Sequence, residues 1–249
     1  MEKILLIAGC SHAAGSEIDG SEDSADNRRL SFGGQLAIKL GYRPINIACP
    51  GYTNASIARS IIKWFEANWT PDAPIEVAVL VAWTESNRIE VPLDDYDSGS
   101  TGGLANWFDV TARHFFNIIL GYKGETKKEK ELCKYFHRFI VENPSYMEIQ
   151  TITNILLIQN FLKLNKIKYL MCNTMQVYTS NNKHVGYYMN MIDKTKYMGV
   201  HSLPNEVFYW KYRNLGYENV NPQFWHLGEE PHHLFAQDLY TFNEENKCL

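Results

Sequence analysis

Short apolar runs alternate with segments of helical periodicity in the first half of the chain, and this alternation restricts the possible folds most strongly. Runs of the length expected for buried strands occur at 4–8, 45–49, 75–83 and 167–172. Segments with helical spacing occur at 30–40, 54–65, 146–164 and 230–242. Strands and helices in this order form βαβ units with parallel strands. We therefore predict an α/β fold, a three-layer α/β/α sandwich with a central parallel sheet of the flavodoxin-like type.

The middle of the chain departs from this pattern. Residues 94–103 are polar and rich in Gly and Ser, which predicts a loop, and 104–120 and 127–141 have the spacing of amphipathic helices. Residues 173–225 are aromatic and irregular and predict no regular element. A length of 249 residues suits one large domain. We predict a single domain over 1–249 with a helical insertion at about 95–140.

Composition and charge exclude several classes of function. The net charge is −4, so we expect no broad basic surface and no nucleic-acid partner. No apolar run approaches the roughly 18 residues of a membrane helix, and the N-terminus lacks the pattern of a signal peptide. The five cysteines show no CxxC pair, which predicts reduced thiols in a reducing compartment. Without a long apolar run, we predict no insertion into a membrane.

Polar side chains follow three of the predicted strands. In an open parallel sheet, ligands bind beyond the carboxyl ends of the strands. The first strand leads into Gly9-Cys10-Ser11-His12, the second into Gly51-Tyr52-Thr53-Asn54, and the third into Thr84-Glu85-Ser86-Asn87-Arg88. A serine in such a turn becomes a nucleophile when a base, usually histidine, takes its proton and N–H donors face the oxyanion. The alternative to a nucleophile is that Ser11 belongs to an ordinary turn or to a helix start that binds an anion.

The order of these blocks resembles the SGNH (GDSL-type) hydrolase superfamily. Gly9-Cys10-Ser11 stands where the family has Gly-Asp-Ser, and Gly51 where it has the glycine after the second strand. Gln223-Phe224-Trp225-His226 stands near the C-terminus where the family has Asp-x-x-His. The chain is most similar to the divergent SGNH-like proteins of bacteriophages, in which Gly-Cys-Ser often replaces Gly-Asp-Ser.

The resemblance implies roles for these residues. Ser11 would be the nucleophile and His226 the base, with the backbone N–H groups of Ser11 and Gly51 in an oxyanion hole. Members of the family are mostly esterases, lipases or carbohydrate O-deacetylases, so the partner would be a small-molecule or glycan ester. No metal and no organic cofactor is implied.

Two departures from the family pattern leave alternatives open. The third block lacks Gly-x-Asn-Asp, so Asn54 or Asn87 would supply the amide donor of the oxyanion hole, since the carboxylate of Glu85 would repel an oxyanion. The residue three before His226 is the uncharged Gln223, and an acid from elsewhere, such as Glu229, could replace it.

His232 and His233 also follow an acid by three residues, in Glu229-x-x-His232 and Glu230-x-x-His233. We rank them below His226 because they fall on the predicted helix 230–242 and His226 in the loop before it. These histidines show no HExxH motif, which disfavours a metal site.

The remaining candidates have structural interpretations. Cys10 and Cys49 are expected to be packing thiols, with Cys10 as a lesser candidate nucleophile. His12 would line the site or pack. Arg88 would form a structural ion pair, or else hold a carboxylate or sugar-acid group. One acidic stretch is expected to be a solvated loop rather than a calcium site; it comprises Glu17, Asp19, Glu22, Asp23 and Asp26.

Three functional hypotheses follow. The first is a serine hydrolase, an esterase acting on an acyl group of a carbohydrate. The second is a catalytically inactive binding or structural protein that keeps the fold, for example a phage virion component. The third is another flavodoxin-like protein whose Ser11-His12 turn binds an anion. The expected location is cytoplasmic or virion-associated.

Overall fold

A five-stranded parallel sheet forms the centre of the computed structural model, which describes residues 2–92, 115–118, 127–136, 138, 144–176, 183–200 and 207–249. The strands lie in the order β2-β1-β3-β6-β7, and each pair of neighbours is parallel. Their bounds are β1 (Glu2–Gly9), β2 (Arg43–Asn46), β3 (Ile75–Trp83), β6 (Lys168–Asn173) and β7 (Tyr197–Met198). A separate antiparallel pair joins β4 (Ile89–Pro92) to β5 (Phe115–Ile118).

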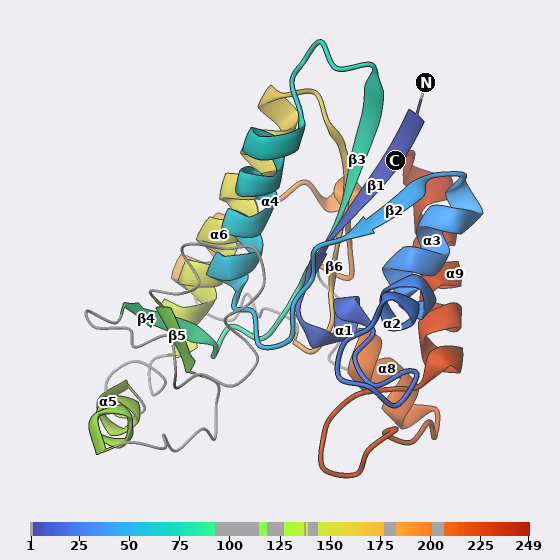
Figure 1. Cartoon of the computed structure of the whole chain (residues 1–249). Coiled ribbons are helices and arrows are strands. Elements are labelled where there is room, and N and C mark those ends of the chain that lie inside the picture. Colours follow the sequence, from blue (N-terminus) through green and yellow to red (C-terminus); the bar gives the residue numbers. More distant parts are fainter. Residues whose placement is uncertain are drawn as a thin grey trace.

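Helices cover both faces of the sheet (Figure 1). One face packs against α4 (Asn54–Asn68), α6 (Pro144–Leu164) and α7 (Lys183–Met189). The other packs against α1 (Ser11–Ala14), α3 (Phe32–Leu40), α8 (Phe208–Asn214) and α9 (Glu229–Asn246), with α2 (Ala25–Leu30) beside α3. The helices α5 (Lys127–Phe136) and η4 (Lys194–Lys196) complete the described elements. The three-layer α/β/α architecture is therefore confirmed.

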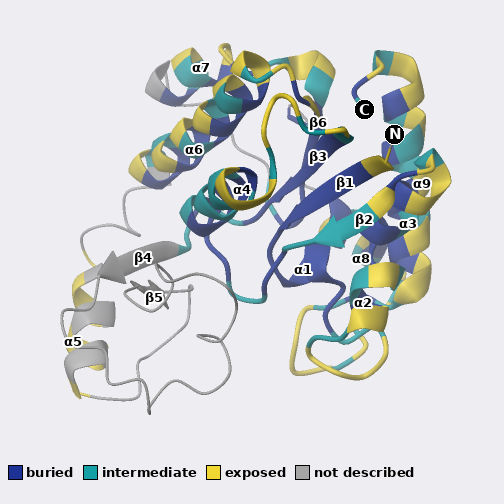
Figure 2. Ribbon diagram, turned by 45° about the horizontal axis from the view of Figure 1, so that its top comes forward, coloured by how far each residue is buried: buried dark blue, intermediate teal, exposed yellow. Residues whose placement is uncertain are grey.

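The alternation of side chains along β1 explains why the sheet needs two helical layers. Leu6 and Ala8 belong to the core on the α4 and α6 side, whereas Leu5 and Ile7 belong to the core on the α3 and α9 side. All four are fully buried, and the central strands are dark throughout most of their length in Figure 2. A strand with two apolar faces cannot be exposed to water on either side, which is why it reads as a continuous apolar run.

The four predicted strands are all present, and the largest shift in their bounds is at the second. The ladder of β2 ends at Asn46, although Ile47 N and Cys49 N still donate to Ile7 O and Gly9 O at 2.8 and 3.2 Å. The helix predicted at 30–40 begins at Phe32, because Ser31 caps it by accepting a hydrogen bond from Gly34 N at 3.2 Å.

The middle of the chain corrects one prediction. Residues 115–118 form the strand β5, not part of a helix over 104–120, because their backbone pairs with β4. The helix predicted at 127–141 is α5, which ends at Phe136. The loop predicted at 94–103 lies outside the described residues, and the single-domain organisation stays a prediction.

The sheet has a topological switch point at β1. The connection after β1 leads to β2 on one side, and the connection after β3 leads to β6 on the other side. The connections that leave the carboxyl ends of the neighbouring strands β1 and β3 therefore run in opposite directions. Such a divergence leaves a crevice between the carboxyl ends of the two strands. Ser11 follows β1 there, and residues 84–88 follow β3. None of the helices in the described ranges is long and apolar enough to cross a membrane.

Candidate active site

Ser11 begins α1 directly after β1 and is 7% exposed. Gly9 allows the tight turn, because a Cβ at this position would lie 2.5 Å from Ala13 Cβ and 2.9 Å from Ala82 O. Within the described part of the chain, neither Ser11 Oγ nor the Ser11 N–H takes part in a hydrogen bond. Both groups are therefore available to a substrate at the switch point.

His226 lies in the loop between α8 and α9, where Val220 N donates to His226 O at 2.9 Å. Its Nδ1 lies 2.7 Å from Glu17 Oε2. A carboxylate oxygen can only accept a hydrogen bond, so Nδ1 carries the proton and Nε2 keeps the lone pair that a general base needs. The His226 ring centroid is 5.5 Å from that of His12, the neighbour of Ser11. This arrangement brings a base to the end of β1, although no hydrogen bond joins it to Ser11 Oγ among the described contacts.

Glu17 is the carboxylate that contacts His226, a partner that the sequence did not indicate. Its side chain is 12% exposed, and its second carboxylate oxygen, Oε1, accepts a hydrogen bond from Asn221 Nδ2 at 3.3 Å. The backbone of Glu17 has the left-handed φ of 69°, which is unfavourable for a residue with a Cβ. Hydrogen bonds hold this turn: Glu17 N donates to Ser21 O, and Gly20 N donates to Glu17 O, both at 2.9 Å.

The loop after Glu17 is cross-linked to α2. Asp19 accepts hydrogen bonds from Ser21 Oγ and Ser24 Oγ at 2.5 and 2.6 Å. The fully buried Asn27 accepts from Asp19 N and donates to Ser21 O, both at 2.8 Å. The hydrogen bonds that Asp19 accepts lower its pKa to about 2. The acidic stretch is therefore an ordered loop that presents Glu17, which corrects its interpretation as a solvated loop for that residue.

The other acid candidates lie away from His226. Gln223 is exposed, and its backbone N–H donates to Asn221 Oδ1 at 3.0 Å. Glu229 is the exposed first residue of α9. Neither has a hydrogen bond or ion pair with His226 in the described part of the chain. Glu17 thus occupies the place that the sequence left to Gln223 or Glu229.

The two histidines of α9 differ from His226. His232 is 1% exposed, its Nδ1 accepts a hydrogen bond from Phe32 N at 3.1 Å, and its ring stacks on Phe32. Burial lowers the pKa of His232 to about 3. His233 is exposed, with Nδ1 2.8 Å from Gln35 Oε1. This geometry favours His226 as the base.

Asn54 has little capacity left for an oxyanion. Its Oδ1 accepts a hydrogen bond from Thr84 N at 2.9 Å. Its Nδ2 lies 3.2 Å from Thr84 O, 3.3 Å from Glu85 O and 3.1 Å from Thr151 Oγ1. An amide has only two N–H hydrogens, so these three acceptors already use them. Asn54 fastens the start of α4 to the loop after β3, which argues against its predicted role as a donor to substrate.

Gly51 and Asn87 lie in the turns that follow β2 and β3. Gly51 has the left-handed φ of 80°, the conformation for which glycine is suited. Asn87 lies in the turn after β3, and its Oδ1 is buried without a hydrogen-bond partner among the described residues. Their assignment to the oxyanion hole stays a prediction.

His12 packs edge-on against His226 and is 3% exposed. Burial, with the nearby charges of His226 and Arg88, lowers its pKa well below the usual value. His12 is therefore neutral near pH 7 and does not oppose a positive charge on His226. Cys10 is fully buried, with Sγ 3.8 Å from Thr174 Oγ1, and burial raises the pKa of Cys49 to about 12. Both have the environment of packing thiols.

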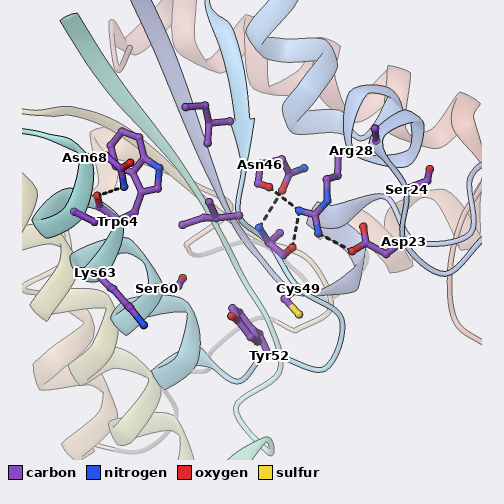
Figure 3. Close-up of a pocket in the computed structure, with 15 residues that line it drawn as sticks. Asp23, Ser24, Arg28, Asn46, Cys49, Tyr52, Ser60, Lys63, Trp64 and Asn68 are labelled. Carbon is purple, nitrogen blue, oxygen red and sulfur yellow. Dashed lines mark hydrogen bonds and ion pairs between the residues drawn. The ribbon is translucent and has the colours of Figure 1, made fainter. Parts of the chain in front are cut away.

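A cavity of about 570 Å³ lies along β2, between α2 and α4 (Figure 3). Its lining includes Ile45, Ile47, Cys49, Tyr52 and Trp64. Because Cys49 N donates to Gly9 O, this cavity adjoins the base of the Ser11 turn through the loop that carries Gly51. The described ranges contain no group of three or more His, Cys, Asp or Glu residues that could hold a metal ion.

Comparison with known proteins supports the fold. No protein-family model matches the chain, and no curated protein matches it. Among solved structures, the lipase Lip_vut3 from a goat rumen metagenome aligns with a TM-score of 0.50 and 9% identity over 97% of both chains. A carbohydrate esterase aligns with a TM-score of 0.49 and 13% identity over 99% of this chain and 69% of its own. TesA aligns with a TM-score of 0.48 and 10% identity over 98% of this chain and 99% of its own. The chain therefore shares the α/β fold of this lipase.

Proposed function

We propose that the protein is a serine hydrolase that cleaves carboxylic esters, with Ser11 as nucleophile, His226 as general base and Glu17 as its acid partner. One observation carries the proposal: Glu17 Oε2 lies 2.7 Å from His226 Nδ1 at the edge of the sheet where Ser11 begins α1. Nucleophile, base and orienting acid are the three parts of a serine hydrolase site, recognised by geometry rather than by sequence order.

The chemistry follows from these positions. Ser11 Oγ attacks the ester carbonyl while His226 Nε2 takes its proton, and the negative charge of Glu17 stabilises the imidazolium. The N–H groups of Ser11 and Gly51 donate to the oxyanion of the tetrahedral intermediate. The imidazolium then gives its proton to the leaving alcohol, and an acyl-enzyme remains. Water, deprotonated by His226, hydrolyses the acyl-enzyme and regenerates Ser11.

Exposed aromatic side chains beside His226 suggest a carbohydrate ester as substrate. Phe224 is 50% exposed and stacks on His226 with centroids 6.3 Å apart. Trp225 is 54% exposed and stacks on Tyr209 at 6.0 Å. Flat apolar faces that remain in water next to a polar site suit the apolar face of a sugar ring. Glycan O-deacetylation is thus the form of the reaction that we propose.

Intact-mass labelling with a fluorophosphonate probe tests the activated serine. The wild-type protein should gain one adduct, and Ser11→Ala and His226→Ala should gain none. His233→Ala is the matched control, because it removes an exposed histidine of α9, and it should label like wild type. Circular dichroism establishes that each variant is folded.

A binding protein with this fold is the second candidate. It is favoured by the lack of a hydrogen bond between Ser11 Oγ and His226 among the described contacts, although catalytic hydrogen bonds are often long without substrate. Folded wild-type protein that gains no adduct would exclude the hydrolase and support this candidate.

A further inference from the structure

Arg88 places a positive charge beside the candidate active site. It lies between the turn after β3 and the start of β4, across the switch point from Ser11, and its side chain is only 9% exposed. The guanidinium is close enough to His12 to contribute to lowering the pKa of that imidazole. Its charge therefore acts on the residue adjacent to the nucleophile.

Only part of this guanidinium is bound by the described residues. Arg88 Nε donates to Glu85 Oε2 at 3.2 Å, and the two terminal nitrogens make no hydrogen bond to any described residue. They are not among the buried polar atoms that lack a partner, so they retain access to solvent. A guanidinium offers five N–H donors in a planar fork, and the described residues leave four of the five for a ligand.

Arg28 shows how a purely structural arginine of this protein differs. Its side chain is 17% exposed, and its terminal nitrogens donate to Asn46 O at 2.6 Å, Ala48 O at 3.0 Å and Asp23 Oδ2 at 2.7 Å. These bonds cap the outer edge of β2, as drawn in Figure 3. Arg28 is bound on both terminal nitrogens, whereas the terminal nitrogens of Arg88 have no hydrogen-bond partner among the described residues.

We propose that Arg88 forms an anion subsite that binds a carboxylate of the ester substrate, as in an O-acylated sugar acid. The proposal rests on the proposed function and names the class of its substrate. A carboxylate matches the fork in a two-bond arrangement, which a neutral ester cannot supply. Glu85 competes for the same cation, so it sets how strongly the subsite binds.

The test compares two chromogenic esters that differ by one carboxylate, 4-nitrophenyl acetate and 5-acetoxy-2-nitrobenzoate. The preference for the anion is the kcat/KM of the anionic ester divided by that of the neutral ester. Dividing this ratio by the ratio of the rates with hydroxide corrects for the different intrinsic reactivity of the two esters. Wild type should prefer the anionic ester about tenfold or more, as expected for a charged hydrogen-bonded pair. Arg88→Gln should remove this preference, and Glu85→Gln should increase it. Arg29→Gln, which removes a 57% exposed arginine of α2, is the control and should match wild type.

The two variants should change the preference for the anionic ester in opposite directions, which distinguishes a binding role of Arg88 from a structural one. If the ion pair only stabilises the turn, Arg88→Gln and Glu85→Gln will lower thermal stability alike and leave the preference unchanged, which overturns the proposal. Titration calorimetry of Ser11→Ala with 5-hydroxy-2-nitrobenzoate and with 4-nitrophenol gives a readout without turnover. Binding of the carboxylate compound alone, lost in Ser11→Ala/Arg88→Gln, supports the subsite; equal binding of both, or of neither, overturns it. The fluorophosphonate experiment reports separately on the proposed function.

Discussion

Replacing Glu17 by glutamine removes the negative charge next to His226 and keeps the shape of the side chain. Glu17 Oε2 and His226 Nδ1 are 2.7 Å apart, and the two side chains are only 12% and 17% exposed. Charge centres about 4 Å apart at an effective dielectric constant of about 20 interact by about 4 kcal/mol. Residual solvent access lowers this, and the glutamine oxygen can still accept the Nδ1–H, so we expect a loss of about 2–4 kcal/mol in the transition state. This corresponds to a decrease of about 30- to 1,000-fold in kcat/KM.

The assay is hydrolysis of 4-nitrophenyl acetate at neutral pH, and the loss should fall on kcat because the imidazolium forms only during reaction. Glu22→Gln is the matched control, since Glu22 is an exposed carboxylate of the same loop, and it should leave the rate unchanged. Retention of the wild-type kcat by a folded Glu17→Gln protein would refute Glu17 as the acid partner. An effect confined to KM would refute it as well.

Three further predictions concern stability. Gly9→Ala should lower the free energy of unfolding by about 1–3 kcal/mol in urea, because its Cβ would lie 2.5 Å from Ala13 Cβ; an unchanged midpoint would contradict the tight turn. Asn54→Ala should cost a similar ~1–3 kcal/mol, because it breaks the link between α4 and the loop after β3, and a stable variant that loses fluorophosphonate labelling would instead place this amide in the oxyanion hole. The pKa of His232 is about 3 in the folded protein and 6.5 ordinarily, so the unfolded state binds more protons between these two pH values. The free energy of unfolding should therefore fall on acidification in this range, and His232 alone contributes about 1.4 kcal/mol per pH unit. His232→Asn keeps an acceptor for Phe32 N–H and should flatten that slope in urea unfolding across pH; an unchanged slope would exclude His232 as its source.

The local sequence pattern was sufficient to predict an element where the apolar residues followed one clear periodicity. The central strands could be predicted because each is an uninterrupted apolar run between turn residues, and the place of Ser11 followed from the Gly9-Cys10-Ser11 turn after the first run. The stretch at 104–120 misled, because Phe115–Ile118 is apolar enough to fit a helix and its pairing with β4 depends on residues more than twenty positions earlier. Short apolar segments are ambiguous in this way.

The side-chain partners of the site could not be predicted from the sequence. The sequence leaves the amide of Asn54 available for an oxyanion, whereas in the structure its Nδ2 faces acceptors of Thr84, Glu85 and Thr151. In the sequence, Glu17 is one of several acids that predict a solvated loop. In the structure, its backbone has a φ of 69° and its carboxylate faces His226. The similarity to phage-encoded proteins and a cytoplasmic or virion-associated location stay predictions.

The sequence by itself determined the layers of this protein, because the burial of apolar side chains follows a periodicity that neighbouring residues set. It also determined which turn carries the serine, since Gly9 and Ser11 are adjacent to the strand that positions them. Only the tertiary structure decided which acid faces His226 and how the described residues surround the guanidinium of Arg88. Glu17 and His226 are 209 residues apart, and their contact exists because the loop between α8 and α9 returns to the carboxyl end of β1. No local pattern encodes a contact between two loops whose positions depend on the packing of the whole sheet.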